Sequence, residues 1–281
     1  MGDIPVSAPI LTDAILYAVH AANLEAGELE HAFDTPFRHS DGGQCARKMA
    51  YGALKLPRSE PDDLPGEWVM FMGTLLHREI QDALEHRFGA SCEVEVKVRH
   101  GKLSSGHVDA LVRHPEHGLI CYELKTRGAY AFDKSIGLDR KRYARTEPHG
   151  PGATTIIQGA LNALASNADL LVIGAVSREA VSRQLAERTQ MPDLLRVMAE
   201  WHYSRAEYVA VAERELARMG EIKALLDDDL LPARVATGDE GELVELAPDG
   251  SRPSWQCVYC GYRSLCVAQG AGIVAKPEVE P

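Results

Sequence analysis

The sequence is poor in aromatic residues and has no excess of basic charge. Aromatic side chains make up 6% of the 281 residues, which is too few for a surface that binds its ligands by aromatic stacking. Thirty Lys and Arg residues oppose 41 Asp and Glu residues, so the net charge is -11. This balance excludes a protein that coats nucleic acid through bulk positive charge, and any nucleic-acid site must be local.

Long apolar segments are also absent. The longest stretch without Asp, Glu, Lys or Arg runs from Pro148 to Ala168, and its Thr, Gln, Asn and Ser side chains make it too polar to span a bilayer. The N-terminus lacks a basic segment followed by an apolar one, so it does not resemble a secretory signal. We therefore expect no membrane helix and an intracellular, cytoplasmic protein. In that compartment six cysteines serve as metal ligands or buried thiols rather than disulfides.

The length fits one large domain or two modest ones, and apolar periodicity divides the chain into elements. Helical spacing covers residues 11–32 and Glu67–Phe88, and the second helix is expected to bury one stripe of residues around His77: Val69, Met72, Leu76, Ile80 and Leu84. Three segments with strand character follow: Cys92–Arg99, Gly106–Val112 and Leu119–Thr126. A helix, a buried strand and a mostly helical region that begins at Pro192 are expected next: Thr154–Ala165, Leu170–Ser177 and 192–226.

Acidic and basic side chains share one face of the two strands that the turn at 114–118 joins. Strand alternation places His107 and Asp109 on one face of the first strand, and Glu123 and Lys125 on one face of the second. If the hairpin pairs these faces, two carboxylates can hold a divalent metal beside a lysine, which suits phosphodiester hydrolysis. A surface salt bridge on an amphipathic strand is the alternative.

The segment GHVDALVRHPEHGLICYELKT at 106–126, in the order helix, three strands, helix and strand, resembles the PD-(D/E)-x-K nuclease superfamily. GTLLH, ending at His77, matches the G-x-x-x-H element of the RecB-like branch, and Gln158 matches its helical glutamine. Asn162 stands where that branch has the tyrosine of Q-x-x-x-Y, so a hydrogen-bonding role survives and an aromatic contact does not.

The resemblance implies roles for these residues. Asp109 and Glu123 would bind Mg²⁺ or Mn²⁺, with His77 and the carbonyl of Leu124 as further ligands. The attacking water would be positioned by two other side chains: Lys125 and Gln158.

Three cysteines near the C-terminus and one far upstream indicate a metal centre. Cys257, Cys260 and Cys266 have the spacing C-x₂-C-x₅-C in a segment expected to be a loop, and Cys45 is the upstream thiol. Zinc and iron–sulfur clusters both accept four thiolates, so ligand identity alone does not separate them. The two remaining cysteines lie in predicted strands and are expected to be buried thiols: Cys92 and Cys121.

One cysteine before the nuclease motifs and three after them resembles the iron–sulfur RecB-like exonucleases, especially the fourth CRISPR-associated (Cas) family and its phage relatives. The resemblance covers roughly Cys45–Cys266 and implies a [4Fe–4S] cluster that joins the two chain ends. It also implies cleavage of DNA from single-stranded ends, with 5′ to 3′ polarity, in end processing for recombination, replication or spacer acquisition. A recombination or CRISPR-adaptation protein is the implied partner. A structure- or sequence-specific endonuclease and a catalytically inactive DNA-binding subunit with a zinc clasp are the alternatives.

Charge is distributed unevenly along the chain. The irregular stretch 127–152 is either a solvated mobile loop or a substrate lid whose basic side chains bind DNA phosphates: Arg127, Lys134, Arg140, Lys141, Arg142 and Arg145. Residues 221–249 are acidic and are either a solubilising surface or a lobe that limits non-specific binding.

We expect an α/β nuclease core with a central mixed sheet at 67–180. A helical segment with the first cluster ligand precedes it at 1–66. A helical and Cys-rich region follows at 181–281.

Overall fold

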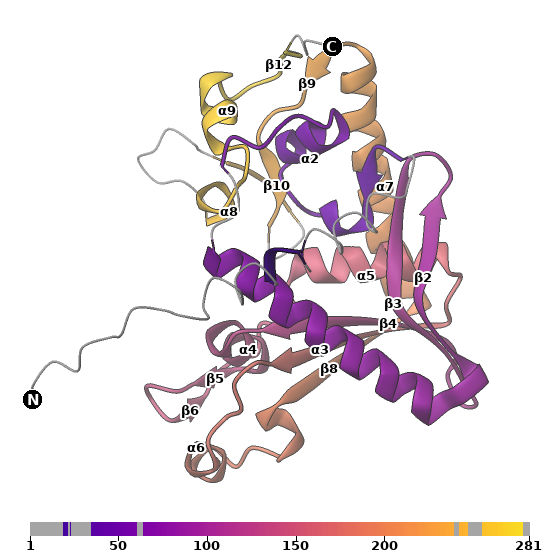
Figure 1. The fold of residues 1–281 in the computed structure, drawn as a ribbon, viewed down its shortest axis with the longest axis vertical. Helices are drawn as coiled ribbons and strands as arrows, with labels where there is room; N and C mark the ends of the chain where they lie inside the picture. The colour runs from indigo at the N-terminus through magenta and orange to yellow at the C-terminus, as the bar shows by residue number, and fades with distance from the viewer. Residues whose placement is uncertain are drawn as a thin grey trace, which may run out of the picture.

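The computed structural model describes residues 19–21, 23, 35–60, 64–238, 242–246 and 255–277. Its centre is a mixed sheet with helices on both faces, and a smaller lobe adjoins it (Figure 1). The helix predicted at 11–32 lies outside the described residues except at 19–21 and 23, which are helical.

The described residues form a central sheet of six strands. Five strands follow one another in the order β1 (Phe37–Arg38), β3 (Ser104–His114), β4 (Gly118–Arg127), β7 (Leu170–Ser177) and β8 (Met198–Ser204), and the sixth, β2 (Cys92–His100), pairs with β3. Strands β4 and β7 run parallel, whereas the β3–β4 and β7–β8 pairs are antiparallel. The predicted mixed sheet is confirmed, as are its first three predicted strands and the buried strand β7.

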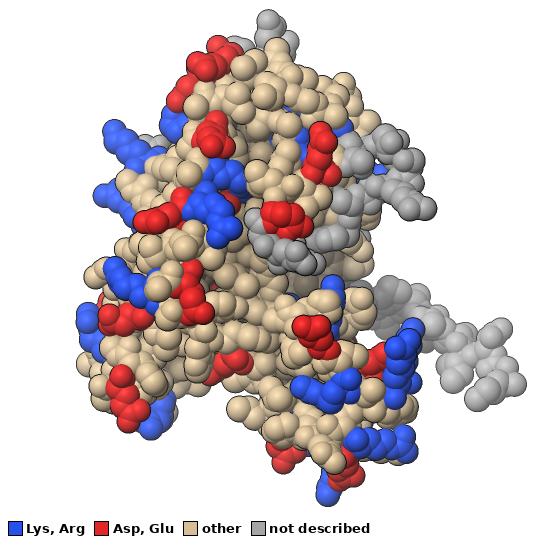
Figure 2. Space-filling model, turned by 180° about the vertical axis from the view of Figure 1, so that it is seen from behind, with Lys and Arg blue, Asp and Glu red and all other residues tan. Residues whose placement is uncertain are grey.

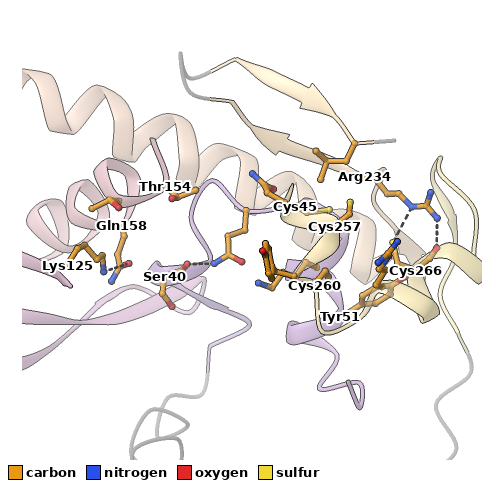
Figure 3. A pocket seen from close by; sticks show the side chains of 17 residues that line it. Ser40, Cys45, Tyr51, Lys125, Thr154, Gln158, Arg234, Cys257, Cys260 and Cys266 are labelled. Atoms are coloured by element: carbon orange, nitrogen blue, oxygen red, sulfur yellow. Dashed lines mark hydrogen bonds between the residues drawn. The ribbon is translucent and has the colours of Figure 1, made fainter. Parts of the chain in front are cut away.

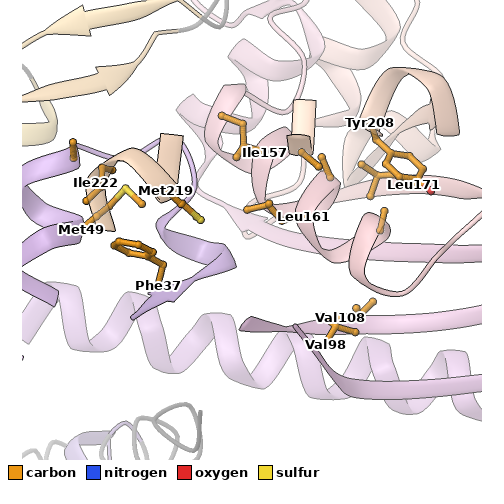
Figure 4. Packing of buried hydrophobic residues seen from close by; sticks show 14 of the residues in the cluster. Phe37, Met49, Val98, Val108, Ile157, Leu161, Leu171, Tyr208, Met219 and Ile222 are labelled. Atoms are coloured by element: carbon orange, nitrogen blue, oxygen red, sulfur yellow. The ribbon is translucent and has the colours of Figure 1, made fainter. Parts of the chain in front are cut away.

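Helices cover both faces of the sheet. On one face α3 (Leu64–Phe88) packs Ile80 and Leu84 against a cluster that includes Leu124. On the other face α5 (Ala153–Ala165) packs Leu161 against Leu171, with α7 (Arg205–Asp227) beyond it (Figure 4). The order helix, three strands, helix and strand is confirmed for α3, β2, β3, β4, α5 and β7, with shorter elements inserted between β4 and α5. The predicted buried stripe of α3 is wrong at its start, because Val69 is 46% exposed.

Shorter elements complete the described chain. Around the sheet lie η1 (His39–Asp41), η2 (Gly89–Ser91), α4 (Ala129–Ile136), β5 (Leu138–Asp139), β6 (Ala144–Arg145), α6 (Arg183–Arg188) and η3 (Leu194–Arg196). The smaller lobe contains α2 (Ala46–Ala53), β9 (Leu230–Leu231), β10 (Val235–Thr237), β11 (Leu243–Glu245), α8 (Trp255–Val258), α9 (Arg263–Ala268) and β12 (Val274–Ala275). Among the described helices, none has the length and apolar character needed to cross a bilayer.

The β2–β3 ribbon changes faces halfway along. Val94 and Ala110 belong to the cluster on the α3 side, whereas Val96 and Val108 belong to the cluster on the α5 side. Alternate residues of a regular strand face the same way, so the ribbon must be interrupted between these pairs. The interruption is at Glu95, which has φ +50°. Glu95 and Asp109 are both left out of the pairing, and the register is the same on either side of them, so the ribbon is distorted there without an inserted residue. The simple alternation used to predict one shared face for His107 and Asp109 is therefore broken at the position of Asp109.

Two predictions about the chain after β4 are corrected by the structure, one of them only at its start. The region 192–226 is mostly helical, as predicted, but no long helix begins at Pro192: the short helix η3 and strand β8 come first, and α7 starts at Arg205. The stretch 127–152, expected to be irregular, contains helix α4 and the β5–β6 hairpin. The corrections add strand β8 to the sheet next to β7, and they add helix α4 and the β5–β6 hairpin directly after β4 in the chain.

Candidate active site and cysteine cavity

Asp109 lies where two strands of the sheet separate. Strands β3 and β4 pair only as far as Ala110↔Tyr122, although both continue beyond that point. At the next position the Asp109 carboxylate oxygen Oδ2 accepts the backbone N–H of Leu124 at 2.6 Å. A side chain thus takes the place of a backbone partner, and Asp109 and Glu123 meet where the two backbones part.

Glu123 and Lys125 follow on β4 and contact helix α5. Lys125 Nζ donates to Glu123 Oε1 at 2.7 Å and to Gln158 Oε1 at 3.0 Å. The second carboxylate oxygen, Glu123 Oε2, accepts a hydrogen bond from Asn162 Nδ2 at 2.9 Å. The Glu123 side chain is 1% exposed and that of Lys125 is 27% exposed, so the lysine lies between the buried carboxylate and solvent.

Burial and neighbouring charges set the protonation of this pair. Burial raises the pKa of Glu123 to about 7; Lys125 opposes the rise and Asp109 adds to it. Burial by itself lowers the pKa of Lys125, but the negative charges of Glu123 and Asp109 outweigh it, so the pKa of Lys125 is raised. The lysine is therefore a cation at neutral pH. A buried carboxylate with a raised pKa beside a charged partner is typical of functional sites.

Helix α3 contributes two residues beside Asp109. His77 Nδ1 lies 3.5 Å from Asp109 Oδ1. Gln81, one turn further along the helix, donates its Nε2 to the Asp109 carbonyl at 3.1 Å and to Glu95 Oε1 at 2.5 Å. Sequence reasoning missed Gln81, although its spacing of four from His77 places both on one helix face. Gln81 holds α3 against the distorted part of the ribbon around Glu95.

The oxygen and imidazole donors of this site fit Mg²⁺ or Mn²⁺. Each carboxylate oxygen of Glu123 accepts one hydrogen bond and retains a further lone pair. Within the described part of the chain, however, no three His, Cys, Asp or Glu side chains are grouped closely enough to hold a metal ion as they stand. Binding therefore requires side-chain movement. The proposed carbonyl ligand belongs to Leu124, whose N–H is bound to Asp109, and its ligand role stays a prediction.

A cavity of about 340 Å³ extends from this site to the cysteines (Figure 3). Lys125 and Gln158 line one part of it, and the other part is lined by all four predicted cluster ligands: Cys45, Cys257, Cys260 and Cys266. Cys45 is at the N-terminus of α2, and the segment expected to be a loop is two short helices joined by a turn. No disulfide joins cysteines of the described residues, and both thiols predicted to be buried are so: Cys92 (7% exposed) and Cys121 (0%).

Burial and nearby N–H donors act in opposite directions on the thiols of the cysteine cavity. Burial raises the pKa of Cys45 to about 11, opposed by the backbone N–H groups of Lys48 and Arg47 at the start of α2. Arg234 Nε donates to Cys266 Sγ at 3.2 Å. Burial outweighs these donors, so the pKa of Cys45 is raised, as is that of Cys260, and metal binding would have to deprotonate both thiols. Four sulfur ligands are the donor set of zinc and of iron–sulfur clusters, but the described thiols are not grouped closely enough to hold a metal as they stand.

Contacts without cysteine also join the two chain ends. Arg47 of α2 is fully buried and donates its Nε to the Pro232 carbonyl at 2.5 Å and its Nη2 to the Gly272 carbonyl at 2.5 Å. Tyr51 Oη donates to Gln269 Oε1 at 2.6 Å. The smaller lobe is therefore packed together by direct contacts around the cysteine cavity.

Several basic side chains of the 127–152 segment are bound within the protein. Arg140 Nη2 donates to Asp133 Oδ1 at 3.1 Å, and Arg127 donates to the Pro151 carbonyl. Burial lowers the pKa of Arg127. Exposed basic residues of the segment are Lys134, Lys141, Arg142 and Arg145, of which Arg142 pairs with Asp139. Figure 2 shows Lys and Arg interspersed with Asp and Glu on the rear face, with no continuous basic stripe in that view.

Comparison with known proteins identifies no family for this chain. No protein-family profile and no curated protein sequence matches it. Among solved structures it is similar to the crystal structure of SSO0001, with 16% identity, a TM-score of 0.49, and coverage of 92% of this chain and 96% of that one. A phage-related exonuclease from Haemophilus somnus 129PT has 12% identity, a TM-score of 0.40, and coverage of 65% and 81%. The alkaline exonuclease LHK-Exo from Laribacter hongkongensis has 16% identity, a TM-score of 0.38, and coverage of 65% and 82%. With TM-scores below 0.5, these likenesses assign neither family nor function to the chain.

Proposed function

We propose that this protein is a metal-dependent nuclease that hydrolyses DNA. The observation that carries the proposal is the meeting of Asp109, Glu123 and Lys125 where β3 and β4 separate, with Gln158 bound to the same lysine. A buried salt bridge that serves only stability explains this arrangement less well, because buried ion pairs often contribute little net free energy of folding. Two carboxylates beside a cation that faces a cavity fit phosphodiester hydrolysis better.

Each residue has a defined chemical role in this proposal. Asp109 and Glu123, with His77 and the Leu124 carbonyl, would hold Mg²⁺ or Mn²⁺, which supplies an activated water and neutralises phosphate charge when bound. Lys125 keeps a protonated ammonium beside the site and stabilises the charge that develops on the phosphate oxygens. Gln158 fixes the direction of that ammonium through its 3.0 Å hydrogen bond.

The finer activity we propose is exonucleolytic cleavage of single-stranded DNA ends, with 5′ to 3′ polarity, in recombination, replication or spacer acquisition. It rests on the sequence resemblance and on the cavity beside Lys125, whose lining, among the described residues, includes basic side chains and no Asp or Glu: Lys48, Arg234 and Arg263 as well as Lys125. In a chain with a net charge of -11, such a lining favours a phosphate-bearing ligand.

We also infer that Cys45, Cys257, Cys260 and Cys266 hold a [4Fe–4S] cluster. This inference is supported by the cavity that the four cysteines share and by the N–H donors around it. A zinc ion bound by the same four thiols is the alternative, and analysis of the metal content of the purified protein distinguishes it from the cluster.

The nuclease proposal is tested with end-labelled linear single-stranded DNA, Mn²⁺ or Mg²⁺, and protein purified without oxygen. Lys125→Met should lower the cleavage rate by about 100-fold or more, because the transition-state charge loses its cation. Lys102→Met, which removes an exposed lysine in the β2–β3 turn, should cleave as the wild type does.

Absence of metal-dependent cleavage by the wild type, or full activity of Lys125→Met, would refute the proposal. Circular single-stranded DNA separates the modes of cleavage, since an exonuclease leaves closed circles intact. Strands labelled at the 5′ or the 3′ end then decide polarity.

A further inference from the structure

Asn162 occupies the place where the sheet opens. Between the β1 contacts at Ser105 and the β4 contacts at Ala110, the edge of β3 that faces β4 has no paired strand among the described residues. Asn162 Nδ2 donates to the carbonyl of His107 in this gap at 2.9 Å, and to Glu123 Oε2 on β4 at 2.9 Å. The Asn162 amide therefore bridges the two strands that carry the acidic residues.

The orientation of this amide is fixed by its third partner. Both Nδ2 contacts are to oxygen acceptors, so the nitrogen must face β3 and β4 and Oδ1 must face the other way. Asn162 Oδ1 lies 2.7 Å from His39 Nδ1. The oxygen can only accept, so His39 carries its proton on Nδ1. The other ring nitrogen, Nε2, is buried and has no hydrogen-bond partner among the described residues.

His39 is uncharged at neutral pH and serves as a hydrogen-bond donor. Its side chain is 1% exposed, and burial lowers its pKa to about 4, an effect that the Asn162 hydrogen bond opposes and the charge of His100 reinforces. At neutral pH the ring is therefore uncharged, with one N–H to donate. A Cβ atom at Gly106 would lie 2.7 Å from His39 Nδ1 and 2.8 Å from Asn162 Oδ1, so the close approach of these residues depends on glycine there.

We propose that Asn162 and His39 are positioning residues of the active site: Asn162 holds the Glu123 carboxylate, and His39 holds the Asn162 amide in the donating orientation. This inference rests on the proposed metal-dependent function of Glu123. Glu123 has one oxygen on Lys125 and the other on Asn162, so the two contacts fix the rotation of the carboxylate plane. Residues that orient a metal ligand in this way change metal affinity or activity by about 10–100-fold when they are removed.

The experiment measures Mn²⁺ binding by calorimetry without DNA, and kcat and KM on linear single-stranded DNA. Asn162→Leu and His39→Leu should weaken Mn²⁺ binding and lower kcat by about tenfold or more, with a smaller change in the KM for DNA. His39→Asn keeps an N–H near the position of Nδ1, so it should bind Mn²⁺ within about threefold of the wild type. Ser104→Ala is the matched control, since it changes a fully buried side chain whose hydroxyl has no partner among the described residues.

The pair His39→Leu and His39→Asn decides the inference even if Asn162→Leu fails to fold. Wild-type Mn²⁺ affinity in His39→Leu would overturn it, and so would equal losses in His39→Leu and His39→Asn, because a lost donor would then not be the cause. Failure of the proposed function has a different signature: the wild type itself would cleave no DNA, or would bind no Mn²⁺.

Discussion

Lowering the pH from 7.5 to 5.0 should lower the free energy of unfolding by about 2 kcal/mol through His39 alone. The side chain is 1% exposed, and its pKa falls from 6.5 to about 4, chiefly because burial disfavours the charged ring. Between these two pKa values the unfolded chain binds more protons at this histidine than the folded chain does. Stability from the neutral ring is therefore fully present above pH 6.5 and is lost as the pH falls toward 4.

The magnitude follows from the two pKa values. Complete protonation of both states would remove about 3.4 kcal/mol, since a pKa difference of one between the folded and unfolded chains corresponds to about 1.36 kcal/mol. At pH 5.0 the unfolded histidine is almost fully protonated while the folded one is mostly neutral, which gives the smaller figure of about 2 kcal/mol.

Urea unfolding followed by tryptophan fluorescence at both pH values measures this effect. Other groups also titrate over the range, so the decisive quantity is the difference between the wild type and His39→Asn, which has no titrating ring. The wild type should lose about 2 kcal/mol more than His39→Asn. His202→Asn is the control, because its ring is 60% exposed, and it should behave as the wild type does. Equal losses in the wild type and His39→Asn would refute the assignment of a buried neutral ring.

Other expected outcomes concern the lobe and the basic surface. Cys45→Ser should lower the iron content and melting temperature of protein purified without oxygen, whereas Cys92→Ser should keep about four iron per chain; stoichiometric zinc without iron would contradict the cluster. Arg47→Met should lower the free energy of unfolding by about 3 kcal/mol or more in urea titrations, because buried carbonyls lose their donors; a loss below about 1 kcal/mol would contradict this. Charge reversal at Lys134 and Lys141 together should raise the KM for single-stranded DNA more than it lowers kcat, and an unchanged KM would place the DNA elsewhere.

Much of the sheet follows from local sequence patterns. The strands at 92–100, 104–114, 118–127 and 170–177 have apolar residues at strand spacing and turn residues between them, so they could be predicted. Strand β8 was missed although its signal was present. The strand alternates polar residues with three apolar ones: Ala199, Trp201 and Tyr203. Because this pattern lies directly before a long helix, the predicted helical region extends over it.

The candidate site could be predicted only in part. Asp109, Glu123 and Lys125 have fixed spacings on neighbouring strands, and the structure brings them together. The role of His39 depends on a partner 123 residues away, so no local pattern reports it. The distortion of the ribbon at Glu95 likewise has no strong sequence signal, because positive φ at a glutamate arises from packing rather than from propensity.

The two proposed metal centres are connected through one short segment of backbone. His39 reaches the Glu123 site through Asn162, and Cys45 lines the cysteine cavity, with only residues 40–44 between them. This segment is closely packed: a Cβ at Gly42 would lie 2.6 Å from Ile157 of α5, and the Gly43 N–H donates to Glu215 of α7 at 3.0 Å. A metal centre that binds Cys45 therefore restrains the segment that orients His39. If the four cysteines hold a metal centre, that centre would act on the proposed nuclease site by restraining the position of His39, and no electron transfer between the two sites would be required.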